Sequence, residues 1–230
     1  MSKIYNKVII PSLCVNLFIG SISIILSLIS SCTNFFDKHR IQDISYKQKI
    51  YNHLPLILFN IIILQPLMVY YGFPYLENFL DFNQSNLVDI FIEAFLISLI
   101  DDTYFYWFHR FMHTNKYLFN KIHYLHHKAK SPNFSDYIYV HPLELIFGSF
   151  GIFISLILLN KIYVDSFLLY LCLRQIHEID IHSGINSIFL RVIPFLSRAE
   201  EHDKHHFKFK CNYASTYIFW DKICDTKNLA

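Results

Sequence analysis

The sequence has little charge, few glycines and no paired-cysteine motif. Only 17% of its 230 residues are charged and 53% are hydrophobic, which leaves too few polar side chains to cover an ordinary soluble domain. Its 20 basic residues barely outnumber its 18 acidic ones, so the chain lacks the basic footprint of a nucleic-acid-binding protein. The five cysteines are scattered without a C-x-x-C pair, and they indicate neither a disulfide framework nor a zinc ribbon.

Long apolar runs are abundant instead. A membrane-spanning helix takes about 20 mostly apolar residues. A single run of that kind could be a buried core helix, but several in so short a chain leave no soluble part that could bury them. The last two runs meet at a turn, Asn160–Lys161, and predict a helical hairpin. We therefore expect an all-α integral membrane protein with two transmembrane helical hairpins plus an N-terminal span, the runs being Val8–Ser31, Leu54–Phe73, Leu87–Phe108, Pro142–Leu159 and Ile162–Ile176.

The distribution of lysine and arginine predicts the orientation, because short cytosolic loops are enriched in both residues. The loop Pro74–Asn86 has none, whereas Arg110–Val140 has five. The segment Cys32–Ile50 is also basic, through Lys38, Arg40, Lys47 and Lys49. We therefore expect a multi-pass protein whose basic loops face the cytosol.

The first run allows more than one interpretation. Lys3 and Lys7 before an apolar stretch resemble a signal peptide, and the residues ending in Cys32 resemble a bacterial lipoprotein cleavage site. An uncleaved anchor needs no further assumption. We divide the chain into a membrane anchor with a cytosolic loop, residues 1–50, and a main domain, residues 51–230.

Thirteen histidines are the most unusual feature, and eleven of them follow residue 108. Ten fall into four groups with spacings such as H-x3-H and H-x2-H-H. Residues three or four apart share one face of a helix, about 5–6 Å apart at Cβ, so such groups can converge on metal. The predicted metal ligands, all near the end assigned to the cytosol, are His109, His113, His123, His126, His127, His177, His182, His202, His205 and His206.

The number of histidines favours two metal ions. Ten neutral imidazoles could give each ion five nitrogens and leave one position open, whereas a single zinc needs only three or four ligands. Imidazole suits iron, zinc and copper, so the spacing leaves the element open. The Glu-x-x-His pairs of soluble di-iron bundles are absent from the sequence. A zinc protease is disfavoured because His177-Glu178 reaches the next histidine, His182, one residue too late for H-E-x-x-H.

Several acids lie close to these histidines. Asp102 shares a helical face with Tyr106, His109 and His113, and an acid at membrane depth is costly enough to suggest a function. We expect it to orient a ligand imidazole, the alternative being a solvated helix end. The same role is open to three acids that lie between candidate ligands, namely Glu178, Asp180 and Asp203.

The order of the histidine groups after paired spans resembles the membrane fatty acid hydroxylase and sterol desaturase superfamily. Within it, the stretch from about Leu54 to Thr226 is similar to the C-4 methylsterol monooxygenase family. The strings that carry this similarity are Asp101-Asp102-Thr103, Tyr139-Val-His-Pro-Leu-Glu144, Ile179-Asp-Ile-His-Ser-Gly184, Asn212-Tyr-Ala-Ser-Thr216 and Trp220-Asp221.

The resemblance implies a di-iron oxygenase at the cytosolic face of an endoplasmic-reticulum-type membrane. Such an enzyme oxidises a sterol C-4 methyl group stepwise to the carboxylate with O2. Its electrons come from NAD(P)H through a separate donor such as cytochrome b5 and its reductase. The resemblance also adds Asn212 to the residues that support the ligands.

The sequence departs from that family at two places. Relatives usually have Glu where this chain has His177, and Phe-Gly-Thr where it has Cys224-Asp225-Thr226. His141 lies between the groups, and we interpret it as a structural or substrate-facing residue rather than a ligand.

Other functions stay open at this stage. The enzyme could be a hydroxylase or desaturase of another sterol or of a fatty acyl lipid. A membrane protein that transports or stores metal would need polar residues through its spans, and an inactive structural relative would bind no iron. Metal content separates these hypotheses.

Overall fold

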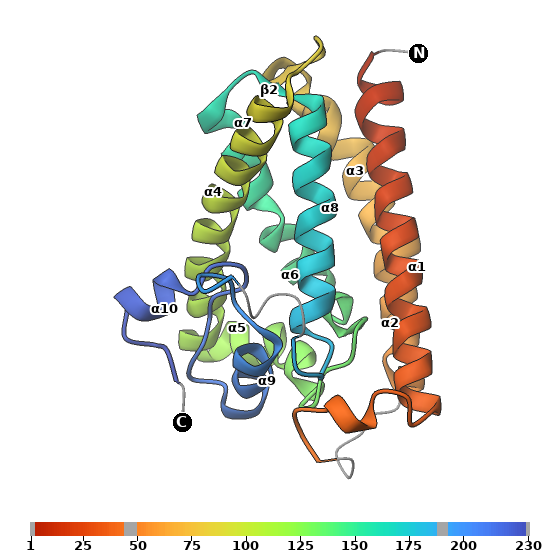
Figure 1. The fold of residues 1–230 in the computed structure, drawn as a ribbon, viewed down its shortest axis with the longest axis vertical. Helices are drawn as coiled ribbons and strands as arrows, with labels where there is room; N and C mark the ends of the chain where they lie inside the picture. The colour runs from red at the N-terminus through yellow and green to blue at the C-terminus, as the bar shows by residue number, and fades with distance from the viewer. Residues whose placement is uncertain (1–2, 44–49, 188–192, 229–230) are drawn as a thin grey trace.

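The computed structural model describes residues 3–43, 50–187 and 193–228, and these residues are mostly helical (Figure 1). The basic residues Lys47 and Lys49 lie outside the described residues. The α-helices are α1 (Ile10–Cys32), α2 (Leu54–Phe59), α3 (Gln65–Gly72), α4 (Leu87–Thr114), α5 (Lys116–Lys121), α6 (Pro142–Gly148), α7 (Phe150–Leu159), α8 (Val164–Ile181), α9 (Ala199–Lys208) and α10 (Phe219–Ile223). Turns of π-helix cover Tyr5–Ile9 and Asn60–Leu64, and 3-10 turns cover Asp37–His39, Ile50–Asn52, Phe73–Phe79, His123–Lys128 and Asp136–Ile138.

Among the residues described, three helical stretches are long and apolar enough to cross a membrane, namely Tyr5–Cys32, Leu54–Phe79 and Pro142–Leu159. The other two expected spans form α4 and α8, but these helices carry charged side chains within them. Asp101 on α4 pairs with Arg174 on α8, with 3.3 Å between the Arg174 Nε and an oxygen of Asp101. The mutual pairing explains why charges are tolerated inside these two helices.

Helix α4 is the centre of the packing, because it contacts both α7 and α8, while α1 runs along α8 (Figure 1). Gly151 makes the closest approach between α4 and α7 possible. A Cβ atom there would lie 2.2 Å from the Asp101 carboxylate and 3.0 Å from its Cα atom, so any larger residue would force the helices apart. The helices α7 and α8 therefore meet chiefly through α4.

The expected turn between α7 and α8 is present. Asn160 and Lys161 both have positive φ angles, 49° and 58°, and Asn is among the residues that tolerate this region. The turn leads into β2 (Ile162–Tyr163), which pairs in parallel with β1 (Leu80–Asp81). This two-stranded pairing was not expected for an all-α protein, and strands of two residues are too short to leave an alternating pattern in the sequence.

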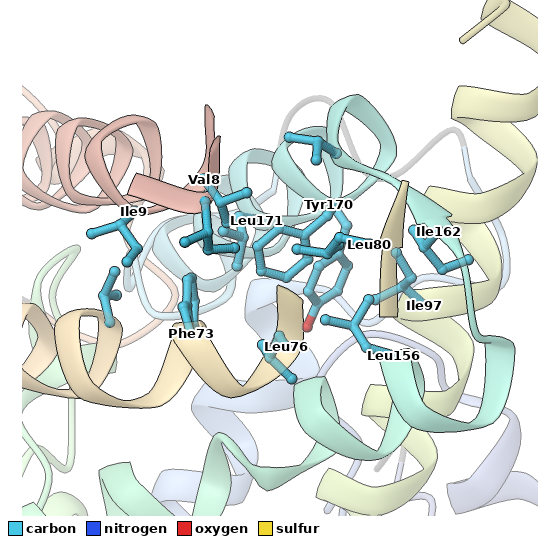
Figure 2. Close-up of a cluster of buried hydrophobic side chains, with 14 of the residues drawn as sticks. Val8, Ile9, Phe73, Leu76, Leu80, Ile97, Leu156, Ile162, Tyr170 and Leu171 are labelled. Atoms are coloured by element: carbon cyan, nitrogen blue, oxygen red, sulfur yellow. The ribbon is translucent and has the colours of Figure 1, made fainter. Parts of the chain in front are cut away.

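The main hydrophobic core lies among the Tyr5–Ile9 turn, α3, the Phe73–Phe79 turn, α4, α7 and α8 (Figure 2). It includes Val8, Phe73, Ile97, Leu156 and Tyr170, each no more than 6% exposed. The helices α5, α9 and α10 gather at the opposite end of the molecule from β2 (Figure 1). The bundle thus forms one rigid apolar half and carries a polar cap of short helices and loops at its other end.

Candidate metal centre

Nine of the ten predicted histidine ligands gather in two groups within the cap. In each group, one candidate ligand atom per residue lies within 4.8 Å of all the others. The first cluster contains His109, His113, His123, His127 and His205, and the second cluster contains His126, His182, His202 and His206. All except His113 are buried.

Helical spacing decides which cluster each histidine joins. On α9, His202 and His206 are four residues apart, share a face and enter the second cluster, while His205 enters the first. In the 3-10 turn, His123 and His127 enter the first cluster and His126 the second. The two H-x2-H-H segments therefore each contribute to both clusters and hold them side by side.

The ring nitrogens in the first cluster converge on a small space. The Nε2 atom of His123 lies 2.8 Å from that of His113, 3.1 Å from that of His109 and 3.0 Å from that of His127. Ligands at right angles and about 2.0–2.1 Å from one metal ion lie about 2.9 Å apart. The spacing is that of nitrogens that share a metal ion.

The second cluster shows the same convergence with slightly wider spacing. The Nε2 atom of His202 lies 2.9 Å from that of His182 and 3.2 Å from that of His206. The Nε2 atoms of His182 and His126 are 3.4 Å apart. Four nitrogens thus surround the second position.

Hydrogen bonds fix the tautomers of several of these imidazoles. The Nδ1–H groups of four histidines donate to backbone carbonyls, and a carbonyl oxygen can only accept. The Nε2 lone pair is therefore free and points into the cluster. The four bonds join His109 to Tyr213 at 2.7 Å, His205 to Cys211 at 2.7 Å, His126 to Tyr139 at 3.3 Å and His182 to Glu178 at 2.9 Å.

Burial keeps these imidazoles neutral. It lowers the pKa of His123 to about 3 and that of His126 to about 4, because the charged form would lose its hydration. Burial also holds the pKa values of His202, His205 and His206 well below the usual value. Neutral imidazole is the form that binds metal. The buried Nε2 atom of His205 has no hydrogen-bond partner among the described residues, as fits a nitrogen reserved for an ion.

Asp102 does not orient a histidine, contrary to our expectation. Its carboxylate accepts hydrogen bonds from the backbone N–H groups of Thr216, at 2.6 Å, and Tyr217, at 3.2 Å. Asp221 accepts in the same way from the N–H groups of Tyr213 and Ala214, both at 2.9 Å. The two buried acids hold the loop that presents the Tyr213 carbonyl to His109.

The carboxylate of Glu178 reaches a histidine at longer range, 3.5 Å from the Nδ1 atom of His182. It is also bonded to Arg174 and to the Ser215 hydroxyl. The other three candidates bond elsewhere. Asp180 accepts from the Ser187 hydroxyl at 2.7 Å, Asp203 accepts from Gln42 at 3.0 Å, and the Asn212 amide donates to the Glu201 carbonyl at 3.0 Å.

His177 is not brought into either cluster. Its Nε2–H donates to the Ser215 carbonyl at 3.0 Å, so it binds the same loop that Asp102 holds. His141 also lies outside both clusters. Its Nδ1 atom accepts a hydrogen bond from the Leu143 N–H at 3.2 Å and caps α6, which is a structural role.

Glu144 is the supporting residue that the sequence analysis missed. Its carboxylate accepts a hydrogen bond from the Nδ1–H of His123 at 2.8 Å, and both side chains are buried. A carboxylate in this position fixes the ring and makes it a stronger ligand. The signal was available, because Glu144 ends the string that begins at Tyr139 and is an acid at the start of an apolar run.

A cavity, which we call the metal cavity, lies against both clusters. It is lined by His109 and His123 from the first cluster and by His126, His182 and His202 from the second. It has about 850 Å³ of empty space, counted with its opening. Apolar side chains such as Phe105, Ile138 and Ile152 form other parts of its wall. Its mainly apolar lining suits a small apolar molecule.

Comparisons with known proteins give related enzymes. The profile of the fatty acid hydroxylase family matches residues 94–226, which include all nine clustered histidines. Methylsterol monooxygenase 1 of Rattus norvegicus is 37% identical over 131 residues, which are 56% of this chain and 44% of the relative. The C-4 methylsterol oxidase of Schizosaccharomyces pombe is 29% identical over 137 residues, which are 57% of this chain and 45% of the relative.

A longer match comes from Dictyostelium discoideum. A protein of this organism that carries the name methylsterol monooxygenase is 34% identical over 209 residues, which are 86% of this chain and 76% of the relative. The chain thus spans less than half of the rat and fission yeast proteins and most of the Dictyostelium protein. No solved structure matches the chain.

Proposed function

The chain belongs to the fatty acid hydroxylase family, and from this premise we propose that it is a membrane-bound, non-haem di-iron oxygenase that oxidises a C-4 methyl group of a sterol. The observation that carries the proposal is the convergence of nine buried histidines into two adjacent clusters beside an apolar cavity. The names of the relatives support the substrate class.

Each cluster suits one metal ion. The first cluster offers five imidazole nitrogens and the second offers four, which leaves positions free on both ions in a six-coordinate arrangement. When bound, two iron ions supply the redox chemistry by which O2 oxidises an unactivated C–H bond. One oxygen atom enters the C–H bond, and two electrons with two protons reduce the other to water.

The protein's own residues then have two tasks. The Nδ1–H bonds to Tyr213, Cys211 and Tyr139 keep the ligand nitrogens aimed inward. The apolar wall of the metal cavity excludes water from the reacting carbon, which limits side reactions. The electrons come from a separate donor protein, for which cytochrome b5 and its reductase fit the substrate class.

The proposed topology follows from the same chemistry. A lipid substrate arrives from the bilayer, whereas O2 and electrons arrive from the aqueous side. We propose a multi-pass arrangement with four core spans in two hairpins after the N-terminal anchor, residues 1–50. The histidine cap of the main domain, residues 51–230, faces the cytosol of an endoplasmic-reticulum-type membrane.

Glycosylation in microsomes tests this orientation. Asn83 lies in an N-x-S sequence on the exposed loop assigned to the lumen. Asn133 lies in another, but its side chain is buried and donates to Ser27 and Ser31. The test uses a variant in which the loop that carries Asn83 is lengthened, so that the glycosyltransferase in the lumen can reach it. We expect a glycan on Asn83 and none on Asn133. A glycan on Asn133 would contradict the orientation.

Rescue of a yeast strain that lacks its own C-4 methyl oxidase tests the function most directly. We expect the chain to restore sterols without C-4 methyl groups, and the purified protein to contain two irons. Two irons with oxidation of a different lipid would indicate another hydroxylase or desaturase. Bound metal without oxidation of any lipid would indicate a metal-binding protein.

A further inference from the structure

A second cavity, which we call the apolar chamber, lies beside the metal cavity. It is enclosed by residues of α1, α3, α6, α7 and α8 and has about 1090 Å³ of empty space, counted with its opening. Its walls are mainly apolar, with Met68, Val69 and Phe73 on one side and Ile146 and Phe153 on the other. The chamber contacts none of the nine clustered histidines, so the metal centre does not account for it.

The apolar chamber and the metal cavity share a wall. Six residues line both cavities, namely Gln65, Leu145, Ser149, Ile152, Tyr170 and Arg174. Four of the six carry polar side-chain atoms, in contrast to the chamber's apolar walls. We call these four residues, Gln65, Ser149, Tyr170 and Arg174, the polar ring. A molecule that extends from the chamber to the histidines passes it.

The other end of the chamber reaches the surface of the membrane-spanning region. Tyr71 on α3 and Phe150 on α7 both line the chamber, and they are 66% and 42% exposed. They belong to the stretches Leu54–Phe79 and Pro142–Leu159, which are apolar enough to cross a membrane. Exposed side chains of two stretches that are apolar enough to cross a membrane thus line the chamber, which favours an entrance between α3 and α7.

We propose that the apolar chamber binds the apolar body of a hydroxylated lipid, which enters from the bilayer between α3 and α7, and that Gln65 accepts a hydrogen bond from the hydroxyl group of that lipid. The assignment rests on the proposed function for one point only, that the reacting end of the lipid lies in the metal cavity. The polar ring then fixes how far the lipid advances towards the histidines.

Two members of the polar ring carry a buried oxygen without a hydrogen-bond partner among the described residues, Tyr170 and Gln65, and Gln65 suits the lipid hydroxyl better because its side-chain oxygen can only accept. Its Oε1 atom is buried and has no hydrogen-bond partner among the described residues, so a hydroxyl hydrogen would pair it. Arg174 is already occupied, since it bonds to Asp101, Glu178 and Ser215. An unpaired acceptor at the junction of two cavities selects a lipid that brings a donor to that depth.

Two neighbouring positions on α3 provide a matched test. Met68→Trp fills the apolar chamber, whereas Leu67→Trp adds the same side chain to a residue that is 48% exposed and lines only a shallow outer groove. The full chain in nanodiscs is titrated with tritiated 4,4-dimethylcholestanol, its 3-deoxy analogue and octadecanol. Iron content is measured in every variant.

We expect Met68→Trp to weaken sterol binding at least tenfold, while Leu67→Trp stays within twofold of wild type and both keep their iron. Gln65→Leu should weaken binding of 4,4-dimethylcholestanol about fivefold, as for one lost hydrogen bond, and leave the 3-deoxy analogue unchanged. Phe153→Ala widens the chamber and should raise the relative affinity for a sterol with a bulkier side chain.

Equal sterol affinities of Met68→Trp and Leu67→Trp would overturn the proposal that the chamber binds the lipid. The proposal would also fail if Phe153→Ala did not change the relative affinity for the sterol with the bulkier side chain, or if the wild-type protein showed no saturable lipid binding. If Gln65→Leu lost the same affinity for the hydroxylated sterol and for its 3-deoxy analogue, Gln65 would not be the acceptor of the hydroxyl group. If Met68→Trp abolishes binding but the wild type never oxidises its bound sterol, the chamber stands and the proposed function fails.

Discussion

The two histidine clusters share the His123–Lys128 turn and α9 but differ in how their ligands are held. In the first cluster, the Nδ1–H groups of three histidines are bound by the Tyr213 and Cys211 carbonyls and by the Glu144 carboxylate. In the second cluster, two are bound, by the carbonyls of Tyr139 and Glu178. The Nδ1 atoms of His202 and His206 are buried without a partner among the described residues, as is that of His127 in the first cluster.

The clusters also differ in charge. The carboxylate of Glu144 contacts the ring of His123 directly. The carboxylate of Glu178 lies 3.5 Å from His182 and is paired with Arg174, which offsets its charge. The first cluster therefore has more ligands and a nearby negative charge, so we expect it to hold its ion more tightly. The second cluster has more open positions for O2 or substrate.

Removal of one ligand from either cluster has the largest expected effect. His205→Ala should lose the ion of the first cluster and His202→Ala that of the second, so iron falls from two per chain to one and oxidation is abolished. Neither change opens the apolar core, so membrane insertion should persist. His141→Ala is the control, because this residue caps α6 outside both clusters. Full iron and activity in His205→Ala would contradict the dinuclear centre.

The supporting carboxylates give the next largest effect. Glu144→Gln should lower the affinity of the first cluster for its metal ion about 10–100-fold, as is typical when the hydrogen-bond partner of a ligand histidine is changed. Glu178→Gln should have a smaller effect on the second cluster, because the Glu178 carbonyl still holds His182. Competition with a chelator measures both affinities. A larger loss in Glu178→Gln would reverse the proposed contrast between the clusters.

Asp102→Asn tests the loop that supports the first cluster. An amide cannot accept hydrogen bonds from both the Thr216 and Tyr217 N–H groups as the carboxylate does, so we expect a loss of about 1–3 kcal/mol of stability. Thermal unfolding of the metal-free chain measures this loss. Asp225→Asn is the control at an exposed site. Equal midpoints for the two variants would show that the loop does not depend on Asp102.

The smallest effect is expected at His177. The sequence predicts that His177→Leu loses one iron, but its position outside both clusters predicts that both irons remain. The variant loses one hydrogen bond to the Ser215 carbonyl, which contributes about 1 kcal/mol. Metal analysis distinguishes the two predictions. If the His177→Leu protein contained only one iron per chain, His177 would be a metal ligand after all.

Helix positions and candidate ligands could be read from the sequence because both leave periodic patterns. Apolar runs marked the helical stretches, and spacings of three and four grouped His109 with His113 and His202 with His206. The pairing of the charges inside α4 and α8 could not be read in this way, because Asp101 and Arg174 lie far apart in the chain.

The assignment of ligands to clusters could not be read in the same way. Adjacent histidines such as His126 and His127 enter different clusters, which depends on the 3-10 geometry of their turn. The role of Asp102 was also hidden, because its partners are backbone groups more than one hundred residues away. Backbone donors leave no mark in the identity of the residues that carry them.

The loop held by Asp102 has a consequence for the order in which the protein is made. Both clusters need histidines of α9, and the carbonyls that fix His109 and His205 belong to residues 213 and 211. These segments leave the ribosome after every membrane-spanning stretch described above. The helices that precede α9 must therefore form while the metal site is incomplete, and both clusters can hold metal only once residues 199–213 have been made. Delivery of the ions thus follows the synthesis of every membrane-spanning stretch described above.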